Sequence, residues 1–211
     1  MKLPTTRPLV YLITSGLATD ENIETTRLGI LSGVRAAVEA GVHLVQLREK
    51  ALSARYVYDL AMDLFEITHG SDTRLLINGR ADIALGAGAD GVHLTSRSLP
   101  TSTVRERFGK DFLIGVSTHS LDEVRTAERA GADFALFGPV FETPGKAVSR
   151  GIDALGNISK QFPGFPVVGV GGIDQKNYSL VIEAGAAGFA AIRALNDVES
   201  MRRIMGAVPR F

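Results

Sequence analysis

The chain contains 211 residues, 45% of them hydrophobic, and its 23 Lys and Arg residues balance its 23 Asp and Glu residues. This length and apolar content suffice for one core, so a single domain spanning residues 1–211 is expected. The charge balance argues against the basic surface that is typical of proteins that bind nucleic acid or anionic membranes. The partner is therefore expected to be a small molecule.

No apolar run approaches the roughly 18 residues that a membrane helix needs, and cysteine is absent from the chain. The absence of cysteine excludes disulfides, thiolate metal sites and a cysteine nucleophile. We expect a cytoplasmic protein, and a homodimer is one of the oligomeric states that the composition leaves open.

A helix-ending Ala-Gly pair followed at once by an apolar run recurs along the chain. The pairs are Ala40-Gly41, Ala87-Gly88, Ala130-Gly131 and Ala184-Gly185. Glycine is suited to end a helix because it enters the left-handed conformation without a Cβ penalty. Together with the apolar runs between them, these patterns predict eight strands, at residues 9–13, 44–47, 74–77, 91–94, 112–116, 134–137, 166–170 and 188–192.

Eight strands that alternate with helices are compatible with an open doubly wound sheet or with a closed (β/α)8 barrel. The predicted strands are nearly continuous apolar runs, which is typical of strands buried on both faces. A doubly wound nucleotide-binding sheet carries its glycine-rich turn after the first strand. Here the glycines instead cluster after the seventh strand, at residues 169–172. The sequence therefore predicts the α/β class and a (β/α)8 TIM barrel.

Polar side chains gather where the second strand ends. Gln46, Arg48 and Lys50 share one parity along the chain, so we expect them to point into the barrel mouth while Leu47 faces the helices. Charges aimed inward need an anionic ligand or a carboxylate partner. The pattern favours substrate binding by these three residues over a solvated strand end with a structural ion pair.

Other predicted strands also end in polar residues. Asn78 follows the third strand, and Ser117 closes the fifth. Thr143 and Lys146 follow the sixth strand in a segment rich in turn residues, which can offer donors to an anion or form a plain surface loop. These four residues are further candidates for substrate binding.

Two histidines lie close to strand ends. His119 directly precedes Ser120, which stands at capping-box spacing from Glu123 and predicts the start of the next helix. The positive end of that helix disfavours the imidazolium form, so a neutral ring able to accept a proton is expected at His119. The competing interpretation is a rim histidine that binds only the backbone. His93 sits between two apolar residues and is expected to pack in the core.

The ends of the last two strands predict a phosphate site. Gly171 and Gly172 follow the seventh strand, and Ile192 and Arg193 follow the eighth. Barrels commonly bind phosphate at these two adjacent loops, where backbone N–H groups can approach the oxygens closely. The sequence therefore assigns phosphate binding to these four residues.

The carboxylates do not form a convincing metal site. Asp90 and Asp133 precede their strands, which predicts structural caps at the bottom of the barrel. The acids near the top are scattered rather than paired, whereas magnesium bound to a pyrophosphate usually needs one or two well-placed carboxylates. No metal ligand is therefore predicted.

Taken together, these residues resemble the thiamine phosphate synthase superfamily. The resemblance runs from about Leu9 to Leu195 and rests on Gln46-x-Arg48-x-Lys50, Asn78-x-Arg80, Gly91-Val92-His93-Leu94, Ser117-x-His119, Gly138-Pro139-Val140-Phe141-x-Thr143 with Lys146, and Gly171-Gly172-Ile173. It implies a (β/α)8 barrel enzyme of thiamine biosynthesis. It also implies that the loops at Gly171-Gly172 and Ile192-Arg193 hold a thiazole phosphate.

Two departures from the synthase pattern favour another branch of this superfamily. The synthases carry a magnesium-binding aspartate where this chain has Gly79, and a second one after the His-Leu pair, where residues 95–98 offer none. In this respect the chain is similar to TenI, the thiazole tautomerase, which needs no metal. The resemblance then implies that His119 moves the proton that aromatises the thiazole synthase product to the carboxythiazole phosphate. Arg48, Lys50 and Lys146 would steady the substrate's negative charge, without a cofactor.

Two alternatives stay open. The first is thiamine phosphate synthase, which joins a pyrimidine pyrophosphate to the thiazole phosphate and would use magnesium. The second is a barrel without catalytic activity that binds thiamine phosphate or thiazole phosphate and regulates a partner.

Overall fold

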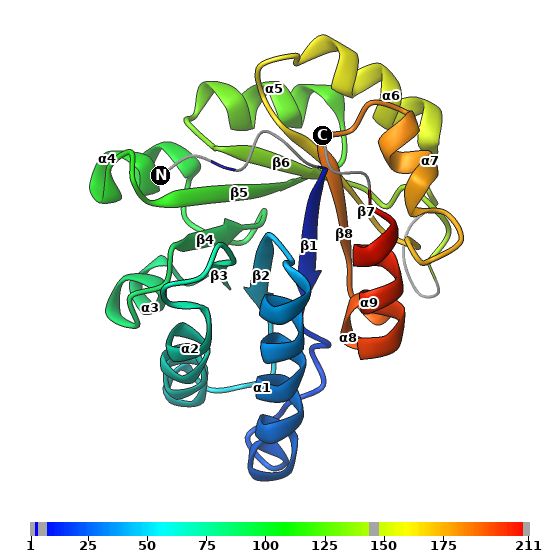
Figure 1. Ribbon diagram of the computed structural model, residues 1–211. Coiled ribbons are helices and arrows are strands. Elements are labelled where there is room, and N and C mark those ends of the chain that lie inside the picture. The colour runs from blue at the N-terminus through cyan, green and yellow to red at the C-terminus, as the bar shows by residue number, and fades with distance from the viewer. Residues whose placement is uncertain (1–2, 4–7, 144–147, 209–211) are drawn as a thin grey trace.

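The computed structural model, which describes residue 3 and residues 8–143 and 148–208, shows a closed barrel of parallel strands in the order β1 to β8. Each strand pairs with the next one along the chain, and β8 closes the barrel on β1 with Gly188 opposite Leu9. Helices surround the strands on the outside (Figure 1). The prediction of a (β/α)8 TIM barrel is confirmed.

The strands are β1 (Leu9–Ile13), β2 (Leu44–Leu47), β3 (Arg74–Asn78), β4 (Gly91–Leu94), β5 (Leu113–Thr118), β6 (Phe134–Phe137), β7 (Val167–Val170) and β8 (Gly188–Ala191). The helices are α1 (Ile23–Ala40), α2 (Ala54–Thr68), α3 (Ala81–Gly86), α4 (Thr101–Phe108), α5 (Leu121–Arg129), α6 (Ile152–Gln161), α7 (Tyr178–Glu183), α8 (Arg193–Asn196) and α9 (Val198–Ala207). Every predicted strand is present. β5 extends further than predicted because Thr118 still pairs with Phe137 of β6.

The predicted Ala-Gly stops form left-handed turns. The φ angles of Gly41, Gly88, Gly131 and Gly185 are 77°, 74°, 87° and 90°. These conformations are strained for any residue with a Cβ, so the glycines set where the helices end. None of the helices in the described part of the chain combines the length and apolarity needed to cross a membrane.

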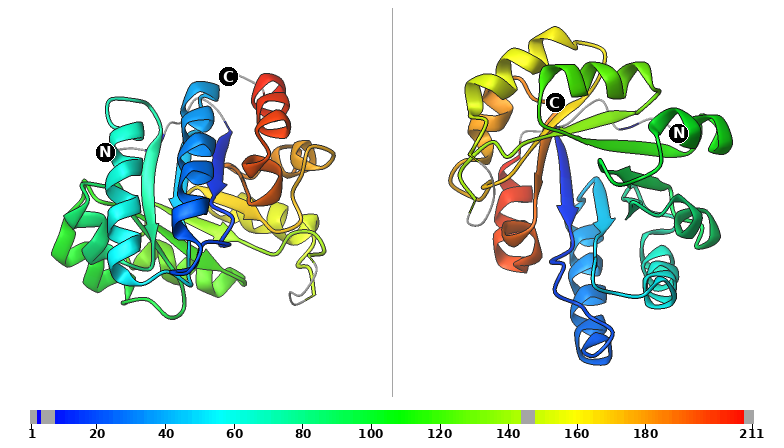
Figure 2. Two further views of the ribbon diagram at one scale, coloured as in Figure 1. Left: turned by 90° about the horizontal axis from the view of Figure 1, so that it is seen from below. Right: turned by 180° about the vertical axis from the view of Figure 1, so that it is seen from behind.

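Side chains alternate along each strand between the barrel interior and the helix layer. The outer core lies between strands and helices and includes Val10, Val45, Leu75, Val92 and Ile114. The interior is filled by a second cluster of Leu9, Tyr11, Ile13, Leu44, Leu76, Phe134, Leu136, Val168 and Ala190. In the helix layer α1 lies between α2 and α9, as Figure 2 shows. Whether a strand residue has an odd or even position therefore decides whether its side chain lies in the interior or against the helices. The same alternation decides which polar side chains can reach the open end of the barrel.

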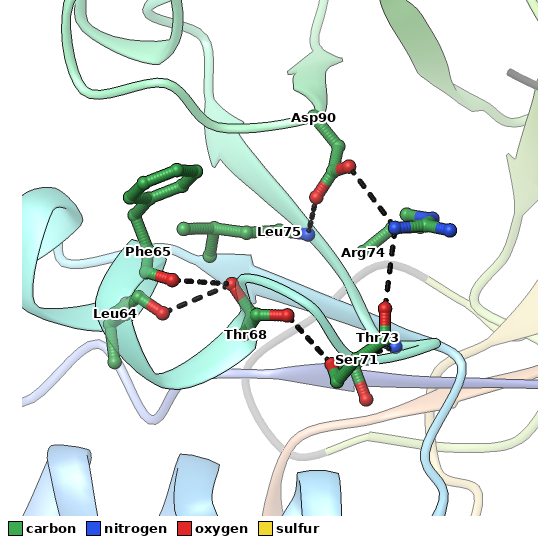
Figure 3. Close-up of polar contacts among 8 residues, drawn as sticks. All are labelled: Leu64, Phe65, Thr68, Ser71, Thr73, Arg74, Leu75 and Asp90. Carbon is green, nitrogen blue, oxygen red and sulfur yellow. Dashed lines mark hydrogen bonds and ion pairs between the residues drawn. The ribbon is translucent and has the colours of Figure 1, made fainter.

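At the bottom of the barrel, Asp90 joins two strands as a structural cap. Its carboxylate accepts a hydrogen bond from Leu75 N at 2.8 Å and pairs with Arg74 at 3.6 Å (Figure 3). Beside it, Ser71 Oγ donates to the Thr68 carbonyl at 2.7 Å and closes the turn between α2 and β3. The Asp90 carboxylate therefore has a structural role.

Asp133 caps the next pair of strands in the same way, and its removal should destabilise the fold. Its carboxylate accepts hydrogen bonds from Ile114 N and Arg105 Nη2, each at 2.7 Å. Asp133→Ala leaves both donors without this acceptor, so the free energy of unfolding should fall by about 2–3 kcal/mol. Urea unfolding followed by circular dichroism measures the change.

Asp122→Ala is the matched control for that experiment. The Asp122 side chain is 89% exposed and pairs with Arg125 on the surface of α5 at 2.9 Å. Such exposed pairs contribute little, so a change within about 0.5 kcal/mol is expected. An equal loss of stability in the two variants would contradict the structural role of Asp133.

Candidate active site

Polar side chains in the barrel interior form two hydrogen-bonded pairs near the carboxyl ends of the strands. Gln46 Nε2 of β2 donates to the Tyr11 hydroxyl of β1 at 2.8 Å. On the other side, His93 Nε2 of β4 lies 2.9 Å from Ser117 Oγ of β5. Tyr11, Gln46 and His93 are buried, so these bonds satisfy groups that solvent does not reach.

Burial governs the ionisation of two of these side chains. It lowers the pKa of His93 from 6.5 to about 3, and the positive charge of Arg48 acts in the same direction. Burial also raises the pKa of the Tyr11 hydroxyl, although the hydrogen bond with Gln46 opposes that shift. Both side chains are therefore neutral at physiological pH.

Arg48 lies beside the loop that follows β1. Its N–H donates to Thr14 Oγ1 at 2.8 Å, and a Cβ on Gly16 would lie 3.0 Å from Arg48 Nη1. The neighbouring Glu49 is buried and accepts hydrogen bonds from two N–H groups of the same loop, at 3.0 and 2.9 Å. Glu49 thus fixes the loop against which the guanidinium of Arg48 rests. Lys50 is exposed.

Asn78 and Ser117 lie at the ends of β3 and β5 and are half-buried. Asn78 stands opposite His93 in the strand register, so it borders the same interior. The nearby Arg80 forms two hydrogen bonds with Asp82, at 2.9 and 2.6 Å. This bonding lowers the pKa of the Asp82 carboxyl. Arg80 therefore stabilises the turn between β3 and α3 through this pair with Asp82.

His119 lies on the exposed rim after β5. Its ring Nδ1 lies 2.5 Å from the Gly138 carbonyl oxygen, an acceptor, so Nδ1 carries the proton in this contact. His119 N donates to Glu123 Oε2 at 2.7 Å, and Ser120 Oγ accepts from Glu123 N at 3.2 Å, which caps α5 where the sequence predicts. The histidine therefore joins the ends of β5 and β6.

The loop after β6 packs against the turn after β7. Phe141 N donates to the Gly171 carbonyl at 3.0 Å. A Cβ on Gly172 would lie 2.6 Å from the Glu142 carbonyl oxygen, and the φ of Gly172 is +66°. Any other residue at this position would push the two loops apart, so glycine is required here.

Two predicted residues belong to this β6 loop. Thr143 Oγ1 donates to the Phe141 carbonyl at 3.3 Å. Lys146 lies outside the described residues, so its predicted contact with an anion stays a prediction.

A groove of about 620 Å³ lies beside the ends of β7 and β8. Gly172 and Arg193, which the sequence assigns to phosphate binding, both line it, together with Lys176. The carbonyls of Gly171 and Gly172 already accept hydrogen bonds from Phe141 N and Asn177 Nδ2. The groove therefore presents the glycine turn and two cations, Lys176 and Arg193, but the carboxylates of Asp174 and Asp197 line it as well.

A (β/α)8 barrel with cations and a glycine turn at the carboxyl ends of its strands is typical of enzymes that act on small phosphorylated molecules. Residues 10–195 match the family model described as thiamine monophosphate synthase, and the chain belongs to that family.

The similar proteins cover nearly the whole chain. It is 46% identical over 187 residues to the putative thiamine-phosphate synthase of Geobacter sulfurreducens, covering 85% of this chain and 87% of that protein. It is 39% identical over 188 residues to the thiamine-phosphate synthase of Clostridium acetobutylicum, covering 88% of each. A solved thiamine phosphate pyrophosphorylase from Pyrococcus furiosus is 30% identical, with a TM-score of 0.78 over 96% of this chain and 97% of that one.

These relatives overturn the prediction of a thiazole tautomerase. The similar proteins are described as thiamine-phosphate synthases or a pyrophosphorylase, so the first alternative is favoured and the tautomerase prediction is wrong. That prediction depended on two missing aspartates, and the loss of metal ligands does not by itself define the reaction. The proton-carrying role predicted for His119 belonged to the tautomerase reaction and falls with it.

The described residues do not fit the magnesium site that the resemblance to synthases implies. Gly79 offers no side-chain oxygen, Glu49 is occupied by backbone N–H groups, and Asp82 is bonded to Arg80. Across residues 8–143 and 148–208, no three His, Cys, Asp or Glu side chains are grouped to hold a metal ion.

His93 is buried, as the sequence predicts, but its place inside the barrel beside Ser117 was not predicted. Val92 and Leu94 pack in the outer core, so parity alone requires the residue between them to face the barrel interior. A second signal is Gly115 on the neighbouring strand, where a Cβ would lie 2.8 Å from His93 Nδ1. The glycine leaves space for the imidazole beside Ser117.

Lowering the pH from 7 to 5 should destabilise the wild-type protein more than a His93→Gln variant. The imidazole has a pKa of about 3 in the folded chain and about 6.5 when exposed, so below pH 6.5 the unfolded state binds a proton that the folded state does not. The free energy of unfolding then falls by up to about 1.4 kcal/mol per pH unit until the pH nears 3.

Between pH 7 and 5 the difference amounts to about 2 kcal/mol. Urea unfolding of both proteins at pH 7, 6 and 5 measures it, and the variant accounts for all other titrating groups. Parallel pH profiles would show that His93 is not held neutral by the fold.

Proposed function

We propose that this chain is a thiamine-phosphate synthase, which joins a pyrimidine pyrophosphate to a thiazole phosphate and releases pyrophosphate. The proposal rests on family membership together with one observation: cationic side chains lie at two different places at this end of the barrel. One is the mouth beside Arg48, and the other is the groove at Gly172 and Arg193. Two substrates that each carry phosphate need two such places.

The cations at the mouth suit the pyrophosphate. Its displacement leaves negative charge on the departing group, and preorganised positive groups and hydrogen-bond donors stabilise that charge best. Arg48 supplies a permanent charge over the loop after β1, and Lys50 supplies a second one at the rim. Gln46 and Ser117 offer neutral hydrogen bonds from the interior.

The thiazole phosphate suits the groove. Gly171, Gly172, Ile192 and Arg193 would hold its oxygens through backbone N–H groups and one guanidinium. Asn78 would orient the pyrimidine, and Thr143 and Lys146 would add donors from the β6 loop. In this assignment the two reacting groups meet above the β-barrel, between the interior pairs and the groove.

Incubation with both substrates should yield thiamine phosphate and pyrophosphate in equal amounts. Chromatography follows the first product and a coupled pyrophosphate assay follows the second, with magnesium present in one series and chelated in another. Reactions that lack the thiazole phosphate are the control. Saturable binding of both ligands without product in either series would contradict the synthase and favour the regulatory alternative.

Arg48→Ala should lower kcat/KM of this condensation by about two to three decades, which is typical for the loss of one charged donor to developing negative charge. Arg48→Lys should recover some of the loss, because it keeps the charge but not the planar fork. Arg125→Ala, on the exposed surface of α5, is the matched control and should leave the rate within about twofold. Equal rates for Arg48→Ala and the control would remove Arg48 from the site.

A further inference from the structure

The interior pair of His93 and Ser117 contains an unpaired atom. His93 is 2% exposed, and its Nδ1 is a buried polar atom without a hydrogen-bond partner in the described part of the chain. Its other ring nitrogen, Nε2, lies 2.9 Å from Ser117 Oγ. Buried polar atoms without partners are rare in native proteins, so the arrangement constrains where the proton of the ring resides.

A neutral imidazole carries one proton, either on Nδ1 or on Nε2. A proton on Nδ1 would be a buried donor that faces Gly115 and the ring of Phe134, whose centroid lies 6.2 Å from that of His93. A proton on Nε2 is satisfied by Ser117 Oγ and leaves only a lone pair at Nδ1. Orphaned N–H groups are rarer than under-satisfied acceptors, so the contact favours the proton on Nε2.

This tautomer decides what Ser117 can do. A hydroxyl has one proton to donate and two lone pairs. When His93 donates to Ser117 Oγ, the hydroxyl proton is free for a group in the barrel mouth. In the opposite tautomer Ser117 would donate to His93 and would present only lone pairs, which repel an anion.

The place of Ser117 on β5 brings its hydroxyl toward the barrel mouth. Ser117 lies two residues beyond Gly115 on β5, the residue opposite His93, and is therefore closer to the barrel mouth. Arg48 directly follows β2 and is half-buried at the same end of the barrel. An anion held by Arg48 is the natural acceptor for the Ser117 proton.

We propose that His93 is a positioning residue: its Nε2–H fixes the Ser117 hydroxyl as a donor to a phosphoryl oxygen of the pyrimidine pyrophosphate. The identity of that anion rests on the proposed function, whereas the orientation of the hydroxyl does not. His93 touches no substrate in this arrangement and acts through Ser117.

The first test reads the tautomer directly. In ¹⁵N-labelled protein at pH 7.5, two-bond proton–nitrogen correlations distinguish a protonated Nε2 from a protonated Nδ1, and His93→Gln identifies which signals belong to residue 93. A proton on Nε2 is expected. A proton on Nδ1 would overturn the proposal, whatever reaction the protein catalyses.

The second test measures binding of inorganic pyrophosphate by calorimetry. Ser117→Ala and His93→Leu should each weaken the affinity roughly tenfold, the value of one hydrogen bond to a charged group. His93→Gln should stay within about threefold of the wild type, because the Gln amide can donate from near the position of the imidazole Nε2. In the double variant, His93→Leu should add nothing to Ser117→Ala, since it acts through that hydroxyl.

Circular dichroism checks that each variant is folded. If His93→Leu does not fold, His93→Gln and the tautomer measurement still test the proposal. Wild-type affinity in a folded His93→Leu protein would overturn it, as would independent effects of the two substitutions in the double variant. If pyrophosphate affinity follows the expected pattern but no thiamine phosphate forms, the positioning role is supported and the proposed function is contradicted.

Discussion

The alternation of side chains inside a closed parallel barrel is the constraint on which the candidate site depends. Only every second residue of each strand faces the interior, and most of these positions are filled by apolar side chains such as Leu44, Leu76, Phe134 and Val168. Tyr11, Gln46 and His93 are among the few polar residues left there and are buried away from water, so each needs a partner within the barrel. This requirement explains why the polar interior residues occur as pairs and why they lie toward one end.

The same constraint separates neutral groups from charged ones. A charge in the interior would lose its hydration, and burial is the main reason that His93 and Tyr11 stay neutral. Permanent charges instead lie at the rim, where Arg48 rests on the loop after β1 and remains half-buried. A strongly anionic substrate at the barrel mouth can therefore contact cations of the rim and neutral hydrogen-bond donors of the interior. This arrangement stabilises the negative charge of the substrate without burying an unpaired ion in the protein.

The fold could be predicted from sequence because its signals are local. Each Ala-Gly stop depends on the backbone freedom of one glycine, and parity along a strand needs no knowledge of the partner strand. Parity placed Gln46 correctly in the interior, and applied to His93 it would have done the same. Its apolar neighbours were taken as evidence of core packing, and His93 is indeed buried; what they did not reveal is its partner Ser117.

The site was harder to predict because its contacts join residues that are distant in sequence. The bond between His119 and the Gly138 carbonyl, and the partners of Glu49, depend on how loops meet after the barrel closes. The function was mispredicted for a related reason. Two missing aspartates were taken to define the reaction. The negative charge of a pyrophosphate can also be neutralised by cations from several loops. Which cations the loops bring together cannot be read from single sequence positions.

Those loop contacts also connect the two proposed substrate regions. Ser117 and His119 belong to the same strand exit, and the His119 ring holds the Gly138 carbonyl at the start of the β6 loop. Three residues later Phe141 N donates to Gly171, the first residue of the glycine turn that borders the groove. Because glycine lets the turn approach the β6 loop so closely, the interior pairs and the groove are positioned by one continuous set of bonds. The His119 ring therefore has a structural role at the rim, because it joins the end of β5 to the loop that packs against the glycine turn.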